Sequence, residues 1–339
     1  MFSWRSLLGF ALSAALLVLT LYLGDVDPAE VRQHLRTTNV PLLLLSAVVA
    51  TSIFPMRARR WRTLLDPVAP DLPFGVLWRP TAIGMMVTNV VPARAGEIAR
   101  AFALTRETPR VGFSAALASI ALDRVFDAFV VLLLMLLAML DPAFPGDQVI
   151  TGGWRVSTLV LVSAVAVIVA VVLLYLIVLF PQRLIGVYAS LAQRLAPRFE
   201  QRGRGMLESF ATGLGALRSP RRALIVFLWT LAHWLTNGFA FWIAFRAVGI
   251  DAPLSAALVL QGIVAIGVSI PSAPGFFGVF EAFGTAGLAI YGVSASLAVT
   301  WAIGFHILSY IPITLIGLYY FVRLGLHFRE LKQARETAG

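Results

Sequence analysis

The sequence predicts an all-α, polytopic membrane protein, and its composition, hydropathy and distribution of charge support that prediction. Hydrophobic residues make up 59% of the 339 residues and charged residues 13%, against roughly 45–50% and about 25% in ordinary soluble domains. The mean hydropathy is +0.85. So little polar surface could not cover so apolar a core. We therefore expect an integral membrane protein, and not a soluble, collagen-like, coiled-coil or disordered chain.

The basic excess lies in short arginine clusters between apolar stretches. The chain has 27 Lys and Arg residues against 17 Asp and Glu residues, a formal net charge of +10, and Lys332 is its single lysine. Such clusters are typical of cytoplasmic loops that face anionic lipid headgroups. We expect these headgroups as partners, and we expect no nucleic acid. The preference for Arg over Lys indicates a GC-rich bacterial gene, and hence a bacterial inner-membrane location.

Six apolar stretches reach or approach the length of about 20 residues that a membrane-crossing helix needs. They are Leu7–Gly24, Val40–Pro55, Phe113–Leu140, Val156–Phe180, Ala223–Val248 and Leu297–Val322. The first of them follows Arg5 in the manner of a signal peptide. It exceeds the usual apolar core of such peptides and lacks a small-residue cleavage site, so we interpret it as the first crossing.

Two further apolar stretches, Val76–Pro92 and Leu254–Pro271, end in Pro and Gly residues. Each is followed by a second short helical stretch, Gly96–Thr105 and Phe276–Tyr291 respectively. A helix, a break and another short helix predict a re-entrant hairpin, which a membrane tolerates only where protein buries it or where it lines a cavity.

The loop charges predict the orientation, because cytoplasmic loops carry the excess of Lys and Arg. Asp25–Asn39 and the external loop, residues 141–154, lean acidic, whereas Arg57–Arg62, the loop 181–222 and the tail 323–339 are basic. Six full crossings with both termini in the cytoplasm satisfy every loop. The first hairpin then enters from the cytoplasm and the second from outside.

The order of elements predicts an inverted repeat. Residues 1–140 contain helix, helix, broken hairpin and helix, and residues 155–322 repeat that order from the opposite side of the membrane. Interrupted helices at matching positions of inverted repeats indicate a transport site near the midplane. The alternative is a coincidence among a few apolar blocks.

The first break carries candidate substrate-binding residues beside its helix breakers. Pro92 removes a backbone donor and Gly96 permits close backbone approach. Binding candidates are Asn89, Arg94, Glu97 and Arg100. An arginine offers a planar fork to phosphate or carboxylate. Because Glu97 and Arg100 are three residues apart, we expect them to pair.

The second break has the same character. Its breakers are Pro271, Pro274, Gly275 and Gly278, and its binding candidates are Ser269 and Glu281. A carboxylate at membrane depth is costly unless it is paired or protonated. Since Glu281 has no cationic neighbour in the sequence, we expect its partner to be an arginine of the first break.

Three further polar groups lie on predicted helices. Asp123, Arg124 and Asp127 precede an apolar run and form either an ion-pair network that docks their helix or part of a gate. The pairs His233 with Asn237 and His306 with Tyr310 each share one helix face. They are either satisfied buried groups or a secondary polar site for protons or headgroups.

Enzyme and metal signatures are missing from the sequence. It contains no Walker A loop, HExxH or GxSxG motif and no cysteine, so it offers no thiol nucleophile and no cysteine-ligated metal site. We expect no metal, no cofactor and no catalytic residue. The loop 181–222 is too small for a nucleotide-binding domain, which argues against transport driven by ATP.

At the residues of the two breaks and of Asp123–Asp127, the chain resembles the lysylphosphatidylglycerol synthase transmembrane-region family, a flippase-like family of membrane proteins. Asp123 is a mild departure, since the family often has Glu there. In the best-known relatives this region is fused to an aminoacyl-transferase domain and moves the lipid product to the outer leaflet. Because the sequence ends at Gly339, soon after the last predicted helix, we expect no transferase activity.

The resemblance implies lipid translocation or headgroup binding, with the lipid left open. Our leading hypothesis is a flippase-like translocator. Arg94 and Arg100 would hold the lipid phosphate, and Glu97 and Glu281 would balance charge. The alternatives are a membrane enzyme or accessory of lipid-linked sugar or polyprenyl-phosphate metabolism, and an ion-coupled carrier of small anions. Homodimerisation is left open.

Overall fold

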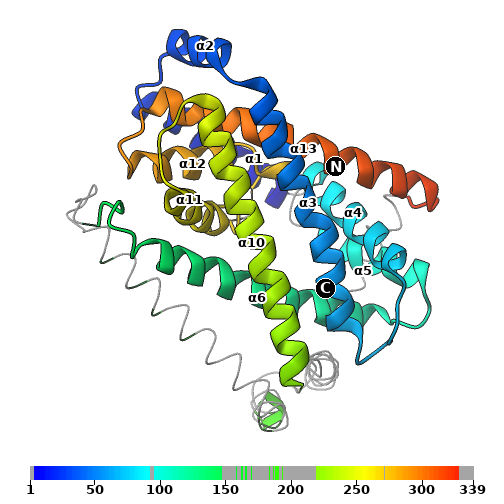
Figure 1. Cartoon of the computed structure of the whole chain (residues 1–339). Coiled ribbons are helices and arrows are strands. Elements are labelled where there is room, and N and C mark those ends of the chain that lie inside the picture. Colours follow the sequence, from blue (N-terminus) through cyan, green and yellow to red (C-terminus); the bar gives the residue numbers. More distant parts are fainter. Residues whose placement is uncertain are drawn as a thin grey trace.

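A computed structural model describes residues 4–91, 95–146, 219–270 and 272–327, together with isolated positions between residues 158 and 193. All regular structure in this part of the chain is helical (Figure 1), as the sequence predicted. The helices are α1 (Trp4–Leu23), α2 (Pro28–Thr37), α3 (Val40–Leu65), α4 (Phe74–Val90), α5 (Ala95–Glu107), α6 (Phe113–Ala138), α10 (Pro220–Val248), α11 (Leu254–Gly267), the 3₁₀ turn η3 (Pro274–Phe276), α12 (Val279–Ala289) and α13 (Ala295–Arg323).

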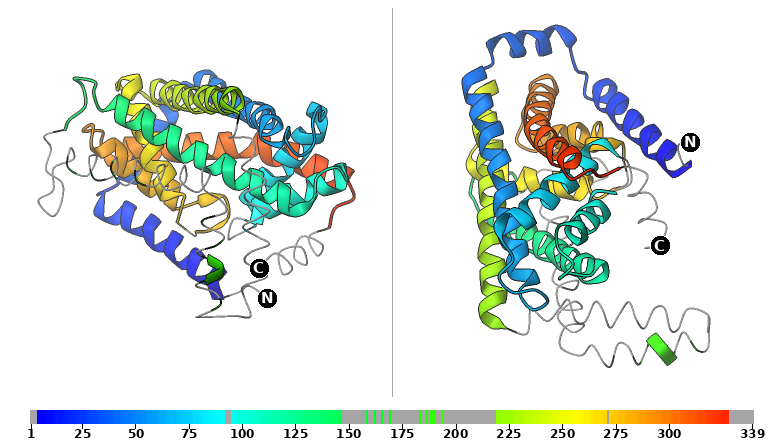
Figure 2. Two further views of the ribbon diagram at one scale, coloured as in Figure 1. Left: turned by 90° about the horizontal axis from the view of Figure 1, so that it is seen from below. Right: turned by 90° about the vertical axis from the view of Figure 1, so that its right-hand side faces the viewer.

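Within the described residues, α3, α10 and α13 are long and apolar enough to cross a membrane. Helix α6 has a similar length of 26 residues, but Asp123, Arg124 and Asp127 interrupt its apolar surface. Helices α3 and α10 lie side by side over most of their length (Figures 1 and 2), and α6 passes across them.

The predicted end of the second crossing at Pro55 is wrong. Helix α3 continues through Pro55 to Leu65, so the arginines from Arg57 to Arg62 are helical and do not form a loop. The helix continues because the residues after Pro55, which include Met, Arg, Ala and Leu, are mostly good helix formers. Arg57 and Arg60, three residues apart, are buried, whereas Arg59 on another face is exposed.

The predicted external loop Asp25–Asn39 contains the unpredicted helix α2. Its start has the expected chemistry: Asp27 Oδ1 accepts a hydrogen bond from the Ala29 N–H at 2.7 Å, and Pro28 occupies the first turn. Proline at this position and an Asp cap both favour a helix start. The helix buries no residue, which explains why apolar periodicity did not reveal it.

Both predicted helix breaks are present. Helix α4 packs on α5, and α11 packs on α12, with α13 beside both α4 and α12. The first break brings Gly96 so close to α4 that a Cβ atom there would lie 2.1 Å from the Gly84 carbonyl oxygen. In the second break Gly275 and Gly278 have φ angles of +65° and +84°, which only glycine adopts readily.

Several predicted features lie outside the described residues. They are Pro92, Arg94, Pro271, the external loop from residue 147, most of the crossing Val156–Phe180 and of the basic loop 181–222, and the tail from residue 328.

Two apolar cores flank the centre of the fold. One joins α10, α11, α12 and α13 through packed aromatic rings; Phe241 and Phe305, for example, meet edge to face with ring centroids 4.9 Å apart. The other joins α3, α4, α5 and α6 around Trp61, which is fully buried. Because these cores hold the two broken hairpins, they fix the geometry of the space between the breaks.

Candidate functional site

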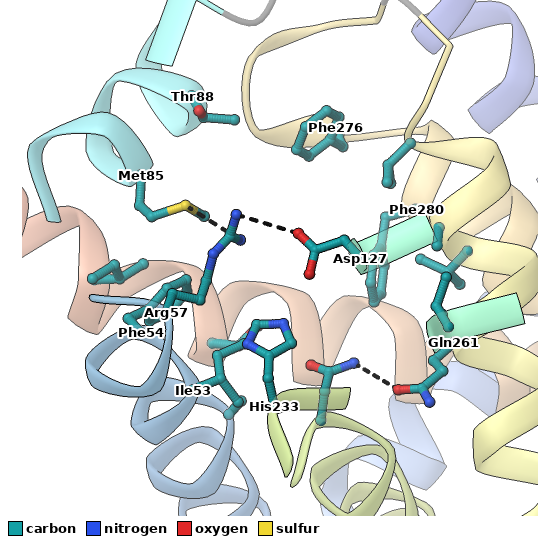
Figure 3. Close-up of a pocket in the computed structure, with 18 of the residues that line it drawn as sticks. Ile53, Phe54, Arg57, Met85, Thr88, Asp127, His233, Gln261, Phe276 and Phe280 are labelled. Atoms are coloured by element: carbon teal, nitrogen blue, oxygen red, sulfur yellow. Dashed lines mark hydrogen bonds and ion pairs between the residues drawn. The ribbon is translucent and has the colours of Figure 1, made fainter. Parts of the chain in front are cut away.

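A cavity of about 650 Å³ lies between the two helix breaks. Side chains from α3, α4, α5, α6, α10, α11, α12 and α13 line it, and most of them are apolar. The predicted site residues that line it are Asn89, Gly96, Glu97, Arg100, Arg124, Asp127, His233, Asn237, Ser269, Gly275, His306 and Tyr310. Figure 3 shows how charged and amide side chains gather around its wall.

Arg60 holds together the ionic cluster at one side of this cavity. Its two terminal nitrogens lie 2.6 Å from Asp123 Oδ1 and 2.7 Å from Asp127 Oδ1. Its Nη1 also donates to the Thr230 hydroxyl of α10 at 3.0 Å. The side chain is fully buried. Arg60 therefore links α3, α6 and α10 through one guanidinium.

The expected pair of Glu97 with Arg100 does not form. Arg100 donates from Nη1 to Asp123 Oδ2 at 3.1 Å and lies over the Trp61 ring, 3.8 Å from its centroid. Glu97 instead contacts Arg124 Nε at 2.9 Å. Both partners come from α6, which packs against α5. The first break is therefore fixed to α6 by two ion pairs.

Arg57 is the least neutralised member of the cluster. Its Nη2 atom lies 3.8 Å from Asp123 and 3.7 Å from Asp127, beyond hydrogen-bond distance. Its Nη1 atom faces the Met85 sulfur at 3.9 Å. Arg57 and Arg60 were missed at the sequence level because they were assigned to a loop. The signal for them was the i, i+3 spacing on a helix that continues past Pro55.

The second break is organised by Glu281 and His306. Glu281 Oε2 accepts a hydrogen bond from the Gly278 N–H at 2.6 Å and so caps α12. Its Oε1 lies 2.7 Å from His306 Nδ1, and His306 Nε2 lies 2.8 Å from the Gly275 carbonyl oxygen. The partner of Glu281 among the described residues is therefore a histidine of α13, from the same half of the chain. It is not Arg100, which pairs with Asp123, and the other candidate, Arg94, lies outside the described residues.

The hydrogen-bond partners define the protonation of this pair. A carbonyl oxygen only accepts, so His306 Nε2 carries a hydrogen. The 2.7 Å contact between Nδ1 and Oε1 then requires one proton between the two side chains. Whichever atom holds it, Glu281 and His306 together have zero net charge. The buried carboxylate therefore needs no arginine.

Asn89 and Tyr310 bring the two breaks into contact. The Tyr310 hydroxyl donates to the Asn89 carbonyl oxygen at 3.2 Å, and the Asn89 side-chain amide donates to the Thr314 hydroxyl at 2.7 Å. The same carbonyl oxygen lies 3.3 Å from where a Cβ of Gly275 would stand. The end of α4 is thus tied to α13 and lies against the second break.

Comparison with known proteins supplies the family. The model of the lysylphosphatidylglycerol synthase TM region matches residues 6–317, nearly the whole chain. The chain belongs to this family. It is a multi-pass membrane protein of the kind that the sequence predicted.

Archaeal relatives of this family member share its length or exceed it. A UPF0104 membrane protein of Methanothermobacter thermautotrophicus is 26% identical over 85% of this chain and 85% of its own length, and a second one is 21% identical over 86% and 88%. The glycosyltransferase AglD of Haloferax volcanii is 26% identical over 89% of this chain. The match covers 51% of AglD, so the chain spans about half the length of that relative.

The predicted polar residues Asn237, His233 and Ser269 do not interact with one another. Asn237 donates to Gln261 Oε1 at 3.2 Å (Figure 3), not to His233. His233 is buried edge-on against Trp234, and its Nδ1 has no hydrogen-bond partner among the described residues. Ser269 donates to the Ile266 carbonyl oxygen at 2.6 Å. Within the described residues no group of three or more His, Asp and Glu side chains could hold a metal ion.

Proposed function

We propose that this protein translocates a lipid with a phosphate-containing headgroup between the two leaflets of a membrane. The observation that carries the proposal is the cavity between the two helix breaks, with an arginine-rich wall on one side and an apolar lining elsewhere. A polar headgroup would occupy the cavity while its acyl chains stay in the bilayer. Membership of a family named after the membrane region of a phospholipid synthase supports a lipid substrate.

The proposed architecture is an inverted repeat with six crossings. Helices α1, α3 and α6 would be the crossings of the first half, with α4 and α5 as its re-entrant hairpin. Val156–Phe180, α10 and α13 would be those of the second half, with α11 and α12 as its hairpin. Motion of one half against the other would expose the cavity to each leaflet in turn. We place the protein in the cytoplasmic membrane of a bacterium, with both termini on the cytoplasmic side.

The proposed binding residues divide between the two breaks. Arg94 and Arg100 would contact the headgroup phosphate, and Glu97 and Glu281 would balance charge or accept a cationic headgroup. Asn89 and Ser269 would supply neutral polar contacts. Asp123 and Arg124 would hold the first break in place, because they pair with Arg100 and Glu97 of α5, and Asp127 would hold α6 against α3 through Arg60.

A reconstitution experiment tests this function. Vesicles with headgroup-labelled phosphatidylglycerol, treated with a membrane-impermeant quencher, should show leaflet exchange only when they contain the protein. We expect Glu97→Gln and Glu281→Gln to abolish exchange. Glu107→Gln is the matched control, since Glu107 is also paired with an arginine, Arg79 at 2.5 Å, but does not line the cavity. Glu281 does not itself line the cavity, but it contacts His306, which does. Unchanged exchange in both variants would remove this site assignment.

A second candidate is a membrane enzyme or accessory of lipid-linked sugar metabolism. The similarity to a protein named as a glycosyltransferase favours it. The two functions differ in their product, because an enzyme converts the lipid covalently and a translocator only relocates it. Recovery of a chemically changed lipid from the same vesicles, analysed by mass spectrometry, would favour the enzyme.

A further inference from the structure

We propose that Arg57 is a phosphate-binding residue of the cavity, and that it takes the phosphate of an anionic lipid headgroup. The identity of this ligand as a lipid rests on the proposed function, whereas the anion site follows from the charges and contacts of the cluster.

The first step is the charge balance of the cluster. Among the described residues, it contains four arginines and three carboxylates. These are Arg57, Arg60, Arg100 and Arg124, and Glu97, Asp123 and Asp127. Arg60, Arg100 and Arg124 each have a carboxylate oxygen within 3.1 Å, whereas the nearest to Arg57 is at 3.7 Å. The unmatched positive charge therefore lies on Arg57.

The second step is burial. The Arg57 side chain is only 8% exposed, and a buried charge without a counter-charge at contact distance is strongly unfavourable. Its Nε and Nη2 atoms have no hydrogen-bond partner among the described residues, and its Nη1 atom faces only a thioether, a weak acceptor. An anion would relieve this cost directly.

The third step is geometry. Nε and Nη2 form one edge of the guanidinium plane, the edge that binds two oxygens of one phosphate side by side. Figure 3 shows the Arg57 guanidinium between Met85 and Asp127, with His233 beside it, and all of these residues line the cavity. His233 Nδ1 is likewise buried and unpartnered among the described residues, and it would offer a second donor when it carries a hydrogen.

The carboxylate of Asp127 does not take the place of the ligand. Its Oδ1 already accepts from Arg60 at 2.7 Å and from the Trp234 indole N–H at 3.1 Å, and its Oδ2 lies 3.4 Å from Arg124. Arg57 is therefore oriented by this carboxylate without being neutralised by it, since Nη2 stays 3.7 Å from Asp127 and Nε has no hydrogen-bond partner among the described residues.

Binding measurements test the inference. Purified protein in neutral detergent would be titrated with dioleoyl phosphatidylglycerol, with dioleoylglycerol as the phosphate-free lipid, and with glycerol phosphate as the lipid-free phosphate. We expect Arg57→Gln to weaken phosphatidylglycerol binding by about tenfold or more, because charged hydrogen bonds are lost, and to leave dioleoylglycerol binding unchanged. The matched control is Arg59→Gln, which removes the same charge from an exposed position of α3.

Each outcome has a defined meaning. Binding of phosphatidylglycerol by Arg57→Gln as tight as by the unmodified protein would overturn the inference. Equal, Arg57-dependent affinity for glycerol phosphate and phosphatidylglycerol would support the anion site but overturn its assignment to a lipid. Arg57-dependent binding without leaflet exchange would contradict the proposed function and leave this inference standing. An unchanged melting temperature of Arg57→Gln would show that lost binding does not reflect misfolding.

Discussion

The two helix breaks have the same outline but opposite electrostatics. Among the described residues, the first belongs to a cluster of seven charged side chains with one unmatched arginine, whereas the second holds one carboxylate, Glu281, which shares a proton with His306. Similar order of elements therefore does not imply similar chemistry. Under the proposed function, the first break would attract an anion into the cavity, whereas the second holds its buried carboxylate without net charge.

The largest expected effect on stability comes from substitution of Arg60, which forms ion pairs with both Asp123 and Asp127. Arg60→Met should lower the free energy of unfolding by about 3–5 kcal/mol, because two buried carboxylates lose their closest cation. Denaturant unfolding of the purified protein measures it. A loss no larger than that of Arg57→Met would show that the two arginines are equivalent, which contradicts our description of the first break.

Gly278 tests how tightly the second break is built. In Gly278→Ala the new Cβ would lie 2.2 Å from the Ser13 carbonyl oxygen of α1, at a φ of +84°. We expect a loss of about 3 kcal/mol from backbone strain and overpacking together. Gly249→Ala is the control, since its φ is +88° but nothing lies within 4 Å, so only the strain of about 1 kcal/mol should remain. Equal losses of stability in the two variants would show that α1 shifts to accommodate the added methyl group at no cost.

Glu281→Gln should have a small effect on stability, below about 1 kcal/mol. The glutamine oxygen can still accept from the Gly278 N–H, and its amide can donate to His306 Nδ1, so both hydrogen bonds survive in a pair that was already neutral. Glu281→Ala removes both bonds and should cost about 2–3 kcal/mol. A large loss in Glu281→Gln would indicate that the carboxylate itself is required, as in an ion pair with a protonated His306.

The smallest effect is expected for Arg57→Met in the absence of lipid. Because no carboxylate of the described residues lies within hydrogen-bond distance of Arg57, removing this unmatched buried charge should raise the unfolding free energy slightly, by about 1 kcal/mol. The thermal melting temperature in neutral detergent measures this. A drop comparable to that of Arg60→Met would mean that Arg57 is a structural ion-pair partner.

The sequence predicted most of the described helices, because apolar helices and their breaks depend on local residue patterns. Apolar length located α1, α3, α6, α10 and α13, and Pro and Gly located both helix breaks. The prediction was wrong at Pro55, where the local preference of proline predicts a helix end. Helix α3 continues past this residue, and Arg57 and Arg60 are buried against α6.

The pairing within the candidate site could not be predicted, since ion pairs between helices depend on packing that the sequence does not contain. Glu97 and Arg100 satisfied the spacing for a pair, but each has its partner on α6. Glu281 had no cation nearby in the sequence, and its partner, His306, lies 25 positions further along on α13. The residue types at the breaks predicted a polar site, but the partner of each residue could not be predicted.

The most direct test of the account is to block the cavity. The chain contains no cysteine, so Ala128→Cys introduces one thiol on the cavity wall, and Leu137→Cys introduces one on the same helix at a position 54% exposed and away from the cavity. After reaction with a bulky maleimide, leaflet exchange of labelled phosphatidylglycerol should stop in the Ala128→Cys protein and continue in the Leu137→Cys protein. Undiminished exchange with the cavity blocked would contradict the proposal that the headgroup crosses between the two breaks.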